Sequence, residues 1–205
     1  MRNLFKPSSK QKVYLFDLDA TITREELLPR IARLNKTFDE MKLLTRDAML
    51  TGSDFETSFR ERVSILADIP LARVQECVSN VPVLEELIDW IQNNQESTFI
   101  VTGNLDIWVE TLLSKYNLKS FSSKAKIVES AIQVEYVLVK EMIIAEFQND
   151  FTVYIGDGSN DIGIMDLSDL GILSEIVHKS PKGLWAVADY AVKDEGALCK
   201  ILNRL

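Results

Sequence analysis

Two aspartates, Asp17 and Asp19, stand one residue apart at the end of the apolar segment VYLFDLD. Two like charges this close repel each other, and burying a carboxylate is costly unless a cation compensates for it. Side chains at positions i and i+2 of an extended segment point the same way. One carboxylate can therefore attack an electrophile while the other gives or takes a proton, so the pair predicts covalent catalysis.

A second acidic motif, YIGDGSND, places Asp157 after another apolar run and Asp161 four residues further on. If the strands that end at Asp17 and Asp157 are neighbours, the two side chains converge on one crevice. On a helix that starts at Asp157, Asp161 lies one turn along the same face. Three or four converging carboxylates favour Mg²⁺, which keeps several waters and accepts a phosphate oxygen.

Short apolar runs that end in a polar or glycine-rich break predict the buried strands of a parallel sheet. Helical patterns lie between these runs, and strands that alternate with helices predict a doubly wound, mostly parallel (Rossmann-like) α/β sheet. The predicted strands cover residues 12–17, 97–103, 151–157, 170–173 and 189–194, and the helical patterns cover residues 104–117, 139–148, 160–168 and 196–205.

Residues 23–80, after the first strand, do not follow this alternation, because their sequence shows several helical patterns in succession. Asp54 is a candidate N-cap within this stretch, and Pro70 suits the first turn of a further helix. We therefore expect an α/β core of residues 1–22 and 81–205, with a helical cap domain of residues 23–80 inserted into it. An insert at this place hangs over the edge of the sheet where open α/β proteins bind ligands.

Composition disfavours several classes of partner. The net charge of the 205 residues is −8 and no cluster of lysines or arginines stands out, which disfavours nucleic acid and anionic membrane surfaces. No apolar run approaches the about 20 residues of a membrane span. Cys77 and Cys199 form no CxxC pattern, which favours a reduced, cytoplasmic location. The only histidine, His178, lies outside the motifs and receives no role; the oligomeric state is left open.

The motifs resemble those of the haloacid dehalogenase superfamily of phosphatases. The matching features are DLDAT at 17–21, the strand ending in Thr102, a downstream lysine and GDGSND at 156–161. The segments DLDATITREELLPRIA, AMLTGSDFETSFRERVSIL and IVTGNLD also resemble the phosphoserine phosphatase subgroup with its small helical cap. The resemblance implies a Mg²⁺-dependent phosphomonoester hydrolase that acts through an aspartyl phosphate, on phosphoserine or a similar small phosphorylated metabolite.

The resemblance also implies catalytic roles. Asp17 would be the nucleophile and a metal ligand, and Asp157 would complete the protein ligands of the metal. Asp19 would protonate the leaving alcohol and later activate water, with its main-chain carbonyl on the metal. Lys140 is chosen to neutralise the charge of the aspartate and the phosphate. Lys124 is the reserve, because the segment before Lys140 is shorter than the usual hairpin and linker of the family.

Other matching residues would bind the phosphate. The Thr102 hydroxyl, the Gly103 N–H and Asn160 would hold phosphate oxygens, and Asp161 would orient the lysine or the metal waters. Taken alone, however, Thr102 is equally consistent with a helix cap, and Lys140 with a solvated helix lysine.

In the cap, Glu26 and Arg62 match the positions that grip the amino and carboxylate ends of phosphoserine, and Phe55 and Met49 match apolar positions. The alternative interpretations are structural. Glu26 also suits a helix N-terminus, where a negative charge is favourable, and Arg62 could pair with a neighbouring surface acid.

Two residues depart from the pattern of the subgroup. Ala20 replaces a serine, and Asn104 replaces a second glycine, where a side chain narrows the pocket or changes its polarity. The substrate could therefore be another small phosphometabolite, and a non-catalytic phospholigand-binding protein is a further alternative. A dehalogenase is disfavoured because it lacks the second aspartate and uses no Mg²⁺. A receiver-type signalling module is disfavoured because it has no helical cap and carries its phospho-acceptor after a mid-chain strand.

Overall fold

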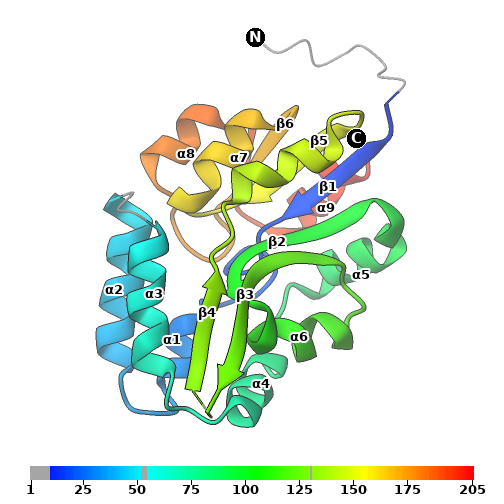
Figure 1. Cartoon of the computed structure of the whole chain (residues 1–205). Helices are drawn as coiled ribbons and strands as arrows, with labels where there is room; N and C mark the ends of the chain where they lie inside the picture. Colours follow the sequence, from blue (N-terminus) through cyan, green and yellow to red (C-terminus); the bar gives the residue numbers. More distant parts are fainter. Residues whose placement is uncertain (1–9, 52–54, 130) are drawn as a thin grey trace.

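The computed structural model describes residues 10–51, 55–129 and 131–205, and the strands in these ranges form one sheet (Figure 1). The strand order is β4-β3-β2-β1-β5-β6-β7, and every neighbouring pair is parallel except the antiparallel hairpin of β3 and β4 at one edge. The predicted mostly parallel α/β sheet is confirmed. The strands are β1 (Lys12–Phe16), β2 (Thr98–Leu105), β3 (Ser120–Val128), β4 (Ala131–Tyr136), β5 (Phe151–Gly156), β6 (Leu170–Ser174) and β7 (Tyr190–Val192).

Helices cover both faces of the sheet, which is why the central strands read as continuous apolar runs. Neighbouring residues of β1 point to opposite faces. Tyr14 and Phe16 pack in one apolar cluster, and Val13 and Leu15 in the other. The first cluster includes residues of α5 (Glu85–Asn93), α6 (Asp106–Lys115) and α9 (Glu195–Leu202), and the second includes residues of η2 (Lys140–Phe147), α7 (Ile162–Leu167) and α8 (Lys182–Val187).

A helical segment lies between β1 and α5 in the chain, beyond the carboxyl end of β1 (Figure 1). Its two connections to the sheet run side by side, because Thr23 and Val83 form an isolated β-bridge and the Leu84 N–H donates to the Ile22 carbonyl at 2.9 Å. Its described helices are α1 (Leu27–Ala32), α2 (Phe38–Thr51), α3 (Phe55–Leu66) and α4 (Leu71–Ser79). The predicted N-cap Asp54 and the side chain of Met49 lie outside the described residues.

Some elements differ from the sequence-based expectation. The helical pattern over 139–148 forms a 3₁₀ helix, η2, and a short 3₁₀ helix, η3 (Ser159–Asp161), precedes α7. The hairpin of β3 and β4 is absent from the predicted strands, because much of β3 and most of β4 are exposed at the sheet edge and carry polar residues. None of the described helices is both long and apolar enough to cross a membrane.

Candidate active site

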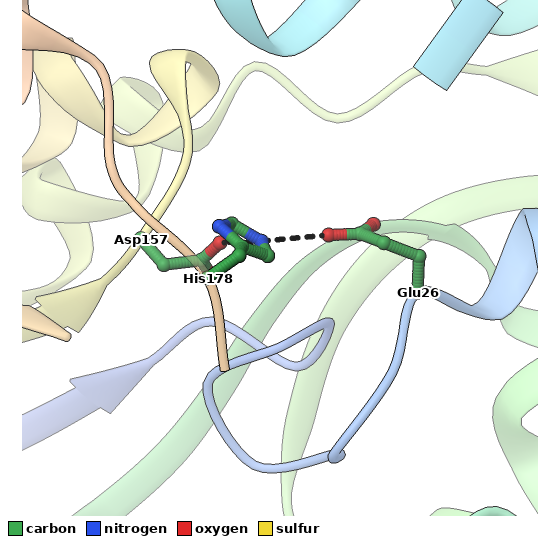
Figure 2. A group of neighbouring side chains, drawn as sticks. All are labelled: Glu26, Asp157 and His178. Atoms are coloured by element: carbon green, nitrogen blue, oxygen red, sulfur yellow. Dashed lines mark hydrogen bonds and ion pairs between the residues drawn. The ribbon is translucent and has the colours of Figure 1, made fainter. Parts of the chain in front are cut away.

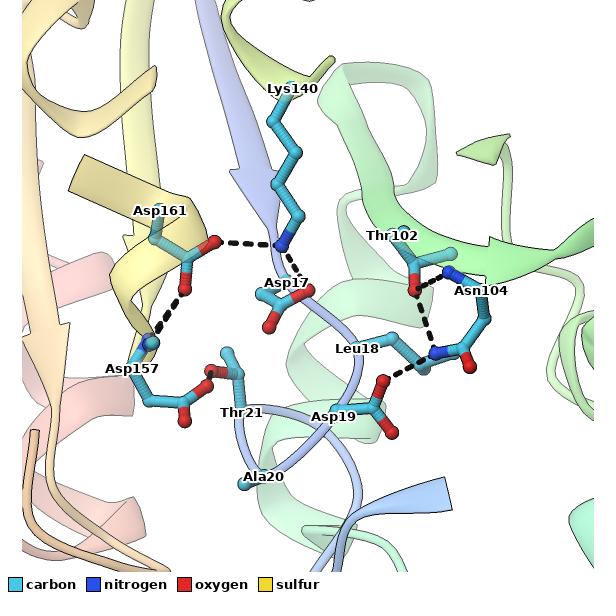
Figure 3. Close-up of polar contacts among 12 residues, drawn as sticks. Asp17, Leu18, Asp19, Ala20, Thr21, Thr102, Asn104, Lys140, Asp157 and Asp161 are labelled. Atoms are coloured by element: carbon cyan, nitrogen blue, oxygen red, sulfur yellow. Dashed lines mark hydrogen bonds and ion pairs between the residues drawn. The ribbon is translucent and has the colours of Figure 1, made fainter. Parts of the chain in front are cut away.

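Asp17 and Asp157 follow the neighbouring strands β1 and β5, so both carboxylates reach the same edge of the sheet (Figure 3). Phe16 pairs with Ile155 in the parallel register, and the Asp17 N–H continues the ladder by donating to the Ile155 carbonyl at 2.8 Å. One oxygen each from Asp17, Asp157 and Asp161 lies within 4.8 Å of the others. The expected convergence of the acidic motifs is therefore present in the structure.

Lys140 lies between two aspartates of this acidic cluster, Asp17 and Asp161. Its Nζ donates to Asp17 Oδ1 at 2.5 Å and to Asp161 Oδ1 at 2.7 Å, and its side chain is only 2% exposed. Burial disfavours the ammonium form, but the charges of Asp161 and Asp17 outweigh burial and raise the pKa of Lys140 above its usual value. Lys124, the reserve lysine, instead pairs with Asp106 at 3.2 Å near the surface. The structure thus brings Lys140, and not Lys124, to Asp17.

Asp161 fixes the turn that follows β5. Its Oδ2 accepts the N–H groups of Asp157 and Gly158, both at 2.9 Å, and its Oδ1 accepts the Tyr154 hydroxyl at 2.6 Å. A Cβ on Gly156 would lie 2.5 Å from Asp161 Oδ2, so this close approach requires a glycine. Asp161 is therefore a buried anchor for its own loop and for the lysine, and sequence analysis missed Tyr154 because it lies within an apolar strand.

The side chains around the acidic cluster do not fully neutralise its negative charge. Burial raises the pKa of Asp17 well above its usual value, against the lowering effect of Lys140. Burial likewise raises the pKa of Asp157 to about 6, against the lowering effect of the hydrogen bond from His178. Thr21 Oγ1 donates to the other oxygen, Asp157 Oδ1, at 2.8 Å. Buried carboxylate oxygens with excess negative charge are the donor set that a hard divalent cation prefers. The residues present therefore fit such an ion.

Asn104 links the second aspartate to the phosphate-binding candidate. The Asp19 Oδ1 accepts the Leu27 N–H at 2.8 Å, and its Oδ2 accepts a hydrogen bond from Asn104 Nδ2. Asn104 also donates to Thr102 Oγ1, through its main-chain N–H at 3.2 Å and through Nδ2 at 3.1 Å. Because Thr102 Oγ1 already accepts two hydrogen bonds, its own proton is available to a bound oxygen. Asn104 therefore places a hydrogen-bonding amide between Asp19 and Thr102.

A cavity of about 60 Å³ lies between the sheet edge and the helical segment. Phe55 of α3 covers it closely, since a Cβ on Gly103 would lie 2.5 Å from Phe55 Cζ. The lining residues include Asp17, Asp19, Gly103, Asn104, Asp157 and Asn160 from the core side and Glu26, Phe55, Phe59 and Arg62 from the helical side.

Arg62 is buried beside this cavity, with only 5% of its surface exposed. Its guanidinium donates to the Ser58 carbonyl at 3.2 Å and to Thr45 Oγ1 at 3.5 Å, and lies 6.0 Å from the centre of the Phe59 ring. Among the described residues, no carboxylate lies within 4.0 Å of it. Burial lowers the pKa of Arg62, partly offset by the charge of Glu26. The alternative of a surface ion pair is therefore not observed in this part of the chain.

His178 is a second residue that sequence analysis missed, because no motif contains it. It lies between β6 and α8, and its Nε2 is 3.1 Å from Glu26 Oε1 and 2.9 Å from Asp157 Oδ2 (Figure 2). Burial disfavours the imidazolium, but the hydrogen bonds to Asp157 and Glu26 outweigh burial and raise the pKa of His178 to about 11. A cationic side chain thus connects the metal-ligand candidate with the helical segment.

Comparison with known proteins places this geometry in context. The family model of haloacid dehalogenase-like hydrolases matches residues 14–166. The phosphoserine phosphatase of Methanocaldococcus jannaschii is 30% identical over 179 residues, which cover 80% of this chain and 85% of that protein. A solved substrate-bound phosphoserine phosphatase complex aligns with a TM-score of 0.79 at 27% identity, covering 97% of this chain and all of the other. A phospho-aspartyl intermediate analogue of phosphoserine phosphatase aligns with a TM-score of 0.78 at 27% identity, covering 96% and 100% of the two chains.

Proposed function

Since the chain belongs to the haloacid dehalogenase-like hydrolase family, we propose that it hydrolyses phosphoserine or a similar small phosphorylated metabolite. The observation that carries this proposal is the buried guanidinium of Arg62, which shares a small cavity with the paired aspartates. A buried cation without a carboxylate partner in the described residues is costly. A substrate that brings its own carboxylate would satisfy it. The names of the relatives, phosphoserine phosphatases, support the same substrate class.

In the first step, a carboxylate oxygen of Asp17 attacks the phosphorus atom, and the bond between phosphorus and the alcohol oxygen breaks. Asp19 gives its proton to that oxygen, so the alcohol leaves neutral. Lys140 holds Asp17 through Oδ1 and leaves Oδ2 for the attack. The Thr102 hydroxyl, the Gly103 N–H and Asn160 bind the other phosphate oxygens.

In the second step, Asp19 acts as a base. It takes a proton from a water molecule, and the water oxygen attacks the phosphorus of the aspartyl phosphate. The bond between phosphorus and the Asp17 oxygen then breaks, which releases inorganic phosphate and restores the carboxylate. One residue can serve in both steps because the first step leaves it deprotonated.

We propose that the carboxylates of Asp17 and Asp157 and the main-chain carbonyl of Asp19 hold Mg²⁺. The all-oxygen, buried donor set around the acidic cluster supports this ion. When bound, it would screen the negative charges of the phosphate and the attacking carboxylate from each other. Residues 23–80 would act as the cap, in which Arg62 binds the substrate carboxylate and Glu26 the ammonium group.

The variant Asp17→Asn tests the covalent chemistry. The amide is a poor nucleophile and keeps the shape of the side chain, so we expect turnover of both phosphoserine and p-nitrophenyl phosphate to fall below detection. Circular dichroism should show an unchanged fold. Retained hydrolysis of p-nitrophenyl phosphate by this variant would contradict the mechanism.

The variant Arg62→Ala tests the substrate class. Loss of one charged hydrogen-bonding partner should lower kcat/KM for phosphoserine by roughly 10- to 150-fold, and p-nitrophenyl phosphate, which has no carboxylate, should be affected much less. Arg46→Ala is a matched control, because Arg46 lies on α2 of the same helical segment and pairs with Asp47 at the surface. Equal losses on the two substrates would argue against carboxylate recognition.

A further inference from the structure

The imidazole of His178 is held in the site by a well-anchored connection between β6 and α8. Glu175, at its start, donates its N–H to the Val192 carbonyl at 2.8 Å, and its Oε1 accepts the Ser180 N–H at 3.0 Å. The Ser180 hydroxyl also donates to the Ser174 carbonyl at 3.3 Å. These bonds close the connection on both sides of His178, so the side chain is presented by a defined loop of the core.

His178 engages only one oxygen of Glu26. Its Nε2 lies 3.1 Å from Oε1 (Figure 2), and no described residue donates a hydrogen bond to Oε2. Glu26 precedes the first residue of α1, and its side chain makes no capping hydrogen bond there. The same carboxylate lines the cavity with Arg62.

We propose that His178 is a positioning residue for substrate selection: it holds Glu26 through Oε1 so that Oε2 receives the ammonium group of an amino-acid phosphate. This inference rests on the proposed function. A free glutamate side chain has three rotatable bonds, and fixing it before the substrate arrives removes part of the entropic cost of binding. The loop between β6 and α8 thereby contributes to substrate selection, together with Glu26 and Arg62 of the helical segment.

The contact with Asp157 fits the same role. His178 Nε2 lies 2.9 Å from Asp157 Oδ2 and 3.1 Å from Glu26 Oε1, so the two carboxylates share its N–H. The imidazole also separates two carboxylates that would otherwise repel each other across the site. His178 therefore keeps Glu26 in place without needing to touch the reacting phosphate.

The test compares phosphoserine with 3-phosphooxypropanoate, which is the same molecule without the ammonium group, at saturating Mg²⁺. We expect wild type to prefer phosphoserine. In His178→Ala, KM for phosphoserine should rise about 10-fold, with a smaller change in kcat, and KM for 3-phosphooxypropanoate should change less than about 2-fold. His178→Gln, whose amide can still donate to Glu26, should recover most of the loss. Glu26→Gln should also lose the preference for phosphoserine over 3-phosphooxypropanoate. The double variant His178→Ala/Glu26→Gln should lose little more than Glu26→Gln alone.

Lys179→Ala is the matched control, since Lys179 is exposed in the same loop, and it should behave as wild type. Equal increases in KM for both substrates in His178→Ala, or no recovery in His178→Gln, would overturn the positioning role. A wild-type enzyme that hydrolyses both substrates without preference would refute the ammonium-bearing substrate and the role of His178 together. A wild type that prefers phosphoserine, with a His178→Ala variant that keeps this preference, would refute the role of His178 alone.

Discussion

Asp19 is held at both carboxylate oxygens, by the Leu27 N–H and by the Asn104 side chain. It faces the cavity but is otherwise surrounded by protein. Burial and the nearby charge of Glu26 raise the pKa of Asp19 to about 7, while the bonds from Leu27 and Asn104 lower it. The residue can therefore hold a proton near neutral pH for the leaving alcohol and can give it up readily, which suits a group that acts first as an acid and then as a base.

The variant Asn104→Leu should shift the pH dependence of this acid. The hydrogen bond from Asn104 stabilises the carboxylate form, so its removal should raise the pKa of Asp19 and move the basic limb of kcat/KM for phosphoserine upward by about one pH unit. With p-nitrophenyl phosphate, whose leaving group needs little protonation, the basic limb should be weaker in both proteins. A basic limb that stays in place or moves to lower pH would contradict the prediction.

At the scale of elements, the helical segment contacts the sheet edge at several described points. Phe55 of α3 lies against Gly103 at the end of β2. The Ser159 hydroxyl of η3 donates to the Ala48 carbonyl of α2 at 3.1 Å, and Arg60 Nη1 donates to the Val134 carbonyl of β4 at 3.1 Å. These contacts hold α2 and α3 against the edge of the sheet where the paired aspartates lie.

The variant Gly103→Ala should disturb the contact between Phe55 of α3 and β2. The new methyl group would meet the end of the Phe55 ring at 2.5 Å, so this ring must shift. We expect KM for phosphoserine to rise about 10-fold while the melting temperature changes little, because the clash lies at a cavity wall. The double variant Gly103→Ala/Phe55→Leu should recover part of the affinity. If Phe55→Leu does not lower the raised KM of Gly103→Ala, the contact with Phe55 is not the cause of that rise.

The whole molecule concentrates negative charge at one sheet edge. Asp17, Asp157 and Asp161 meet there, where Lys140 contacts Asp17 and Asp161 and His178 contacts Asp157. The excess charge opposes folding unless a cation joins it. An ion that binds the folded chain and not the unfolded chain should therefore stabilise the protein.

Addition of Mg²⁺ to the metal-free protein should raise the melting temperature. At a concentration 100 times Kd, the gain is about 2.7 kcal/mol, which corresponds to about 5–10 °C for a chain of this size. Asp157→Asn should lose most of this increase, and Asp106→Asn, which removes a strand-end acid paired with the surface residue Lys124, should keep it. Scanning calorimetry with and without Mg²⁺ measures the effect, and an equal increase in all three proteins would place the ion elsewhere.

The sequence by itself determined the strands of the sheet interior and the acidic motifs at their ends. Buried parallel strands leave continuous apolar runs, and the residue after such a run lies at the carboxyl edge whatever the strand order. The edge hairpin of β3 and β4 carries no such signal, because its side chains are largely exposed.

Only the tertiary structure decided which distant side chains meet those motifs. Lys140 reaches Asp17 across 123 positions, and His178 reaches Glu26 across 152. Local patterns report how a segment is buried, whereas such a contact depends on strand order and on the path of loops between strands. The choice between Lys140 and Lys124 followed from the position of η2 against β2 and β5, and the place of His178 in the site followed from the path of the loop after β6.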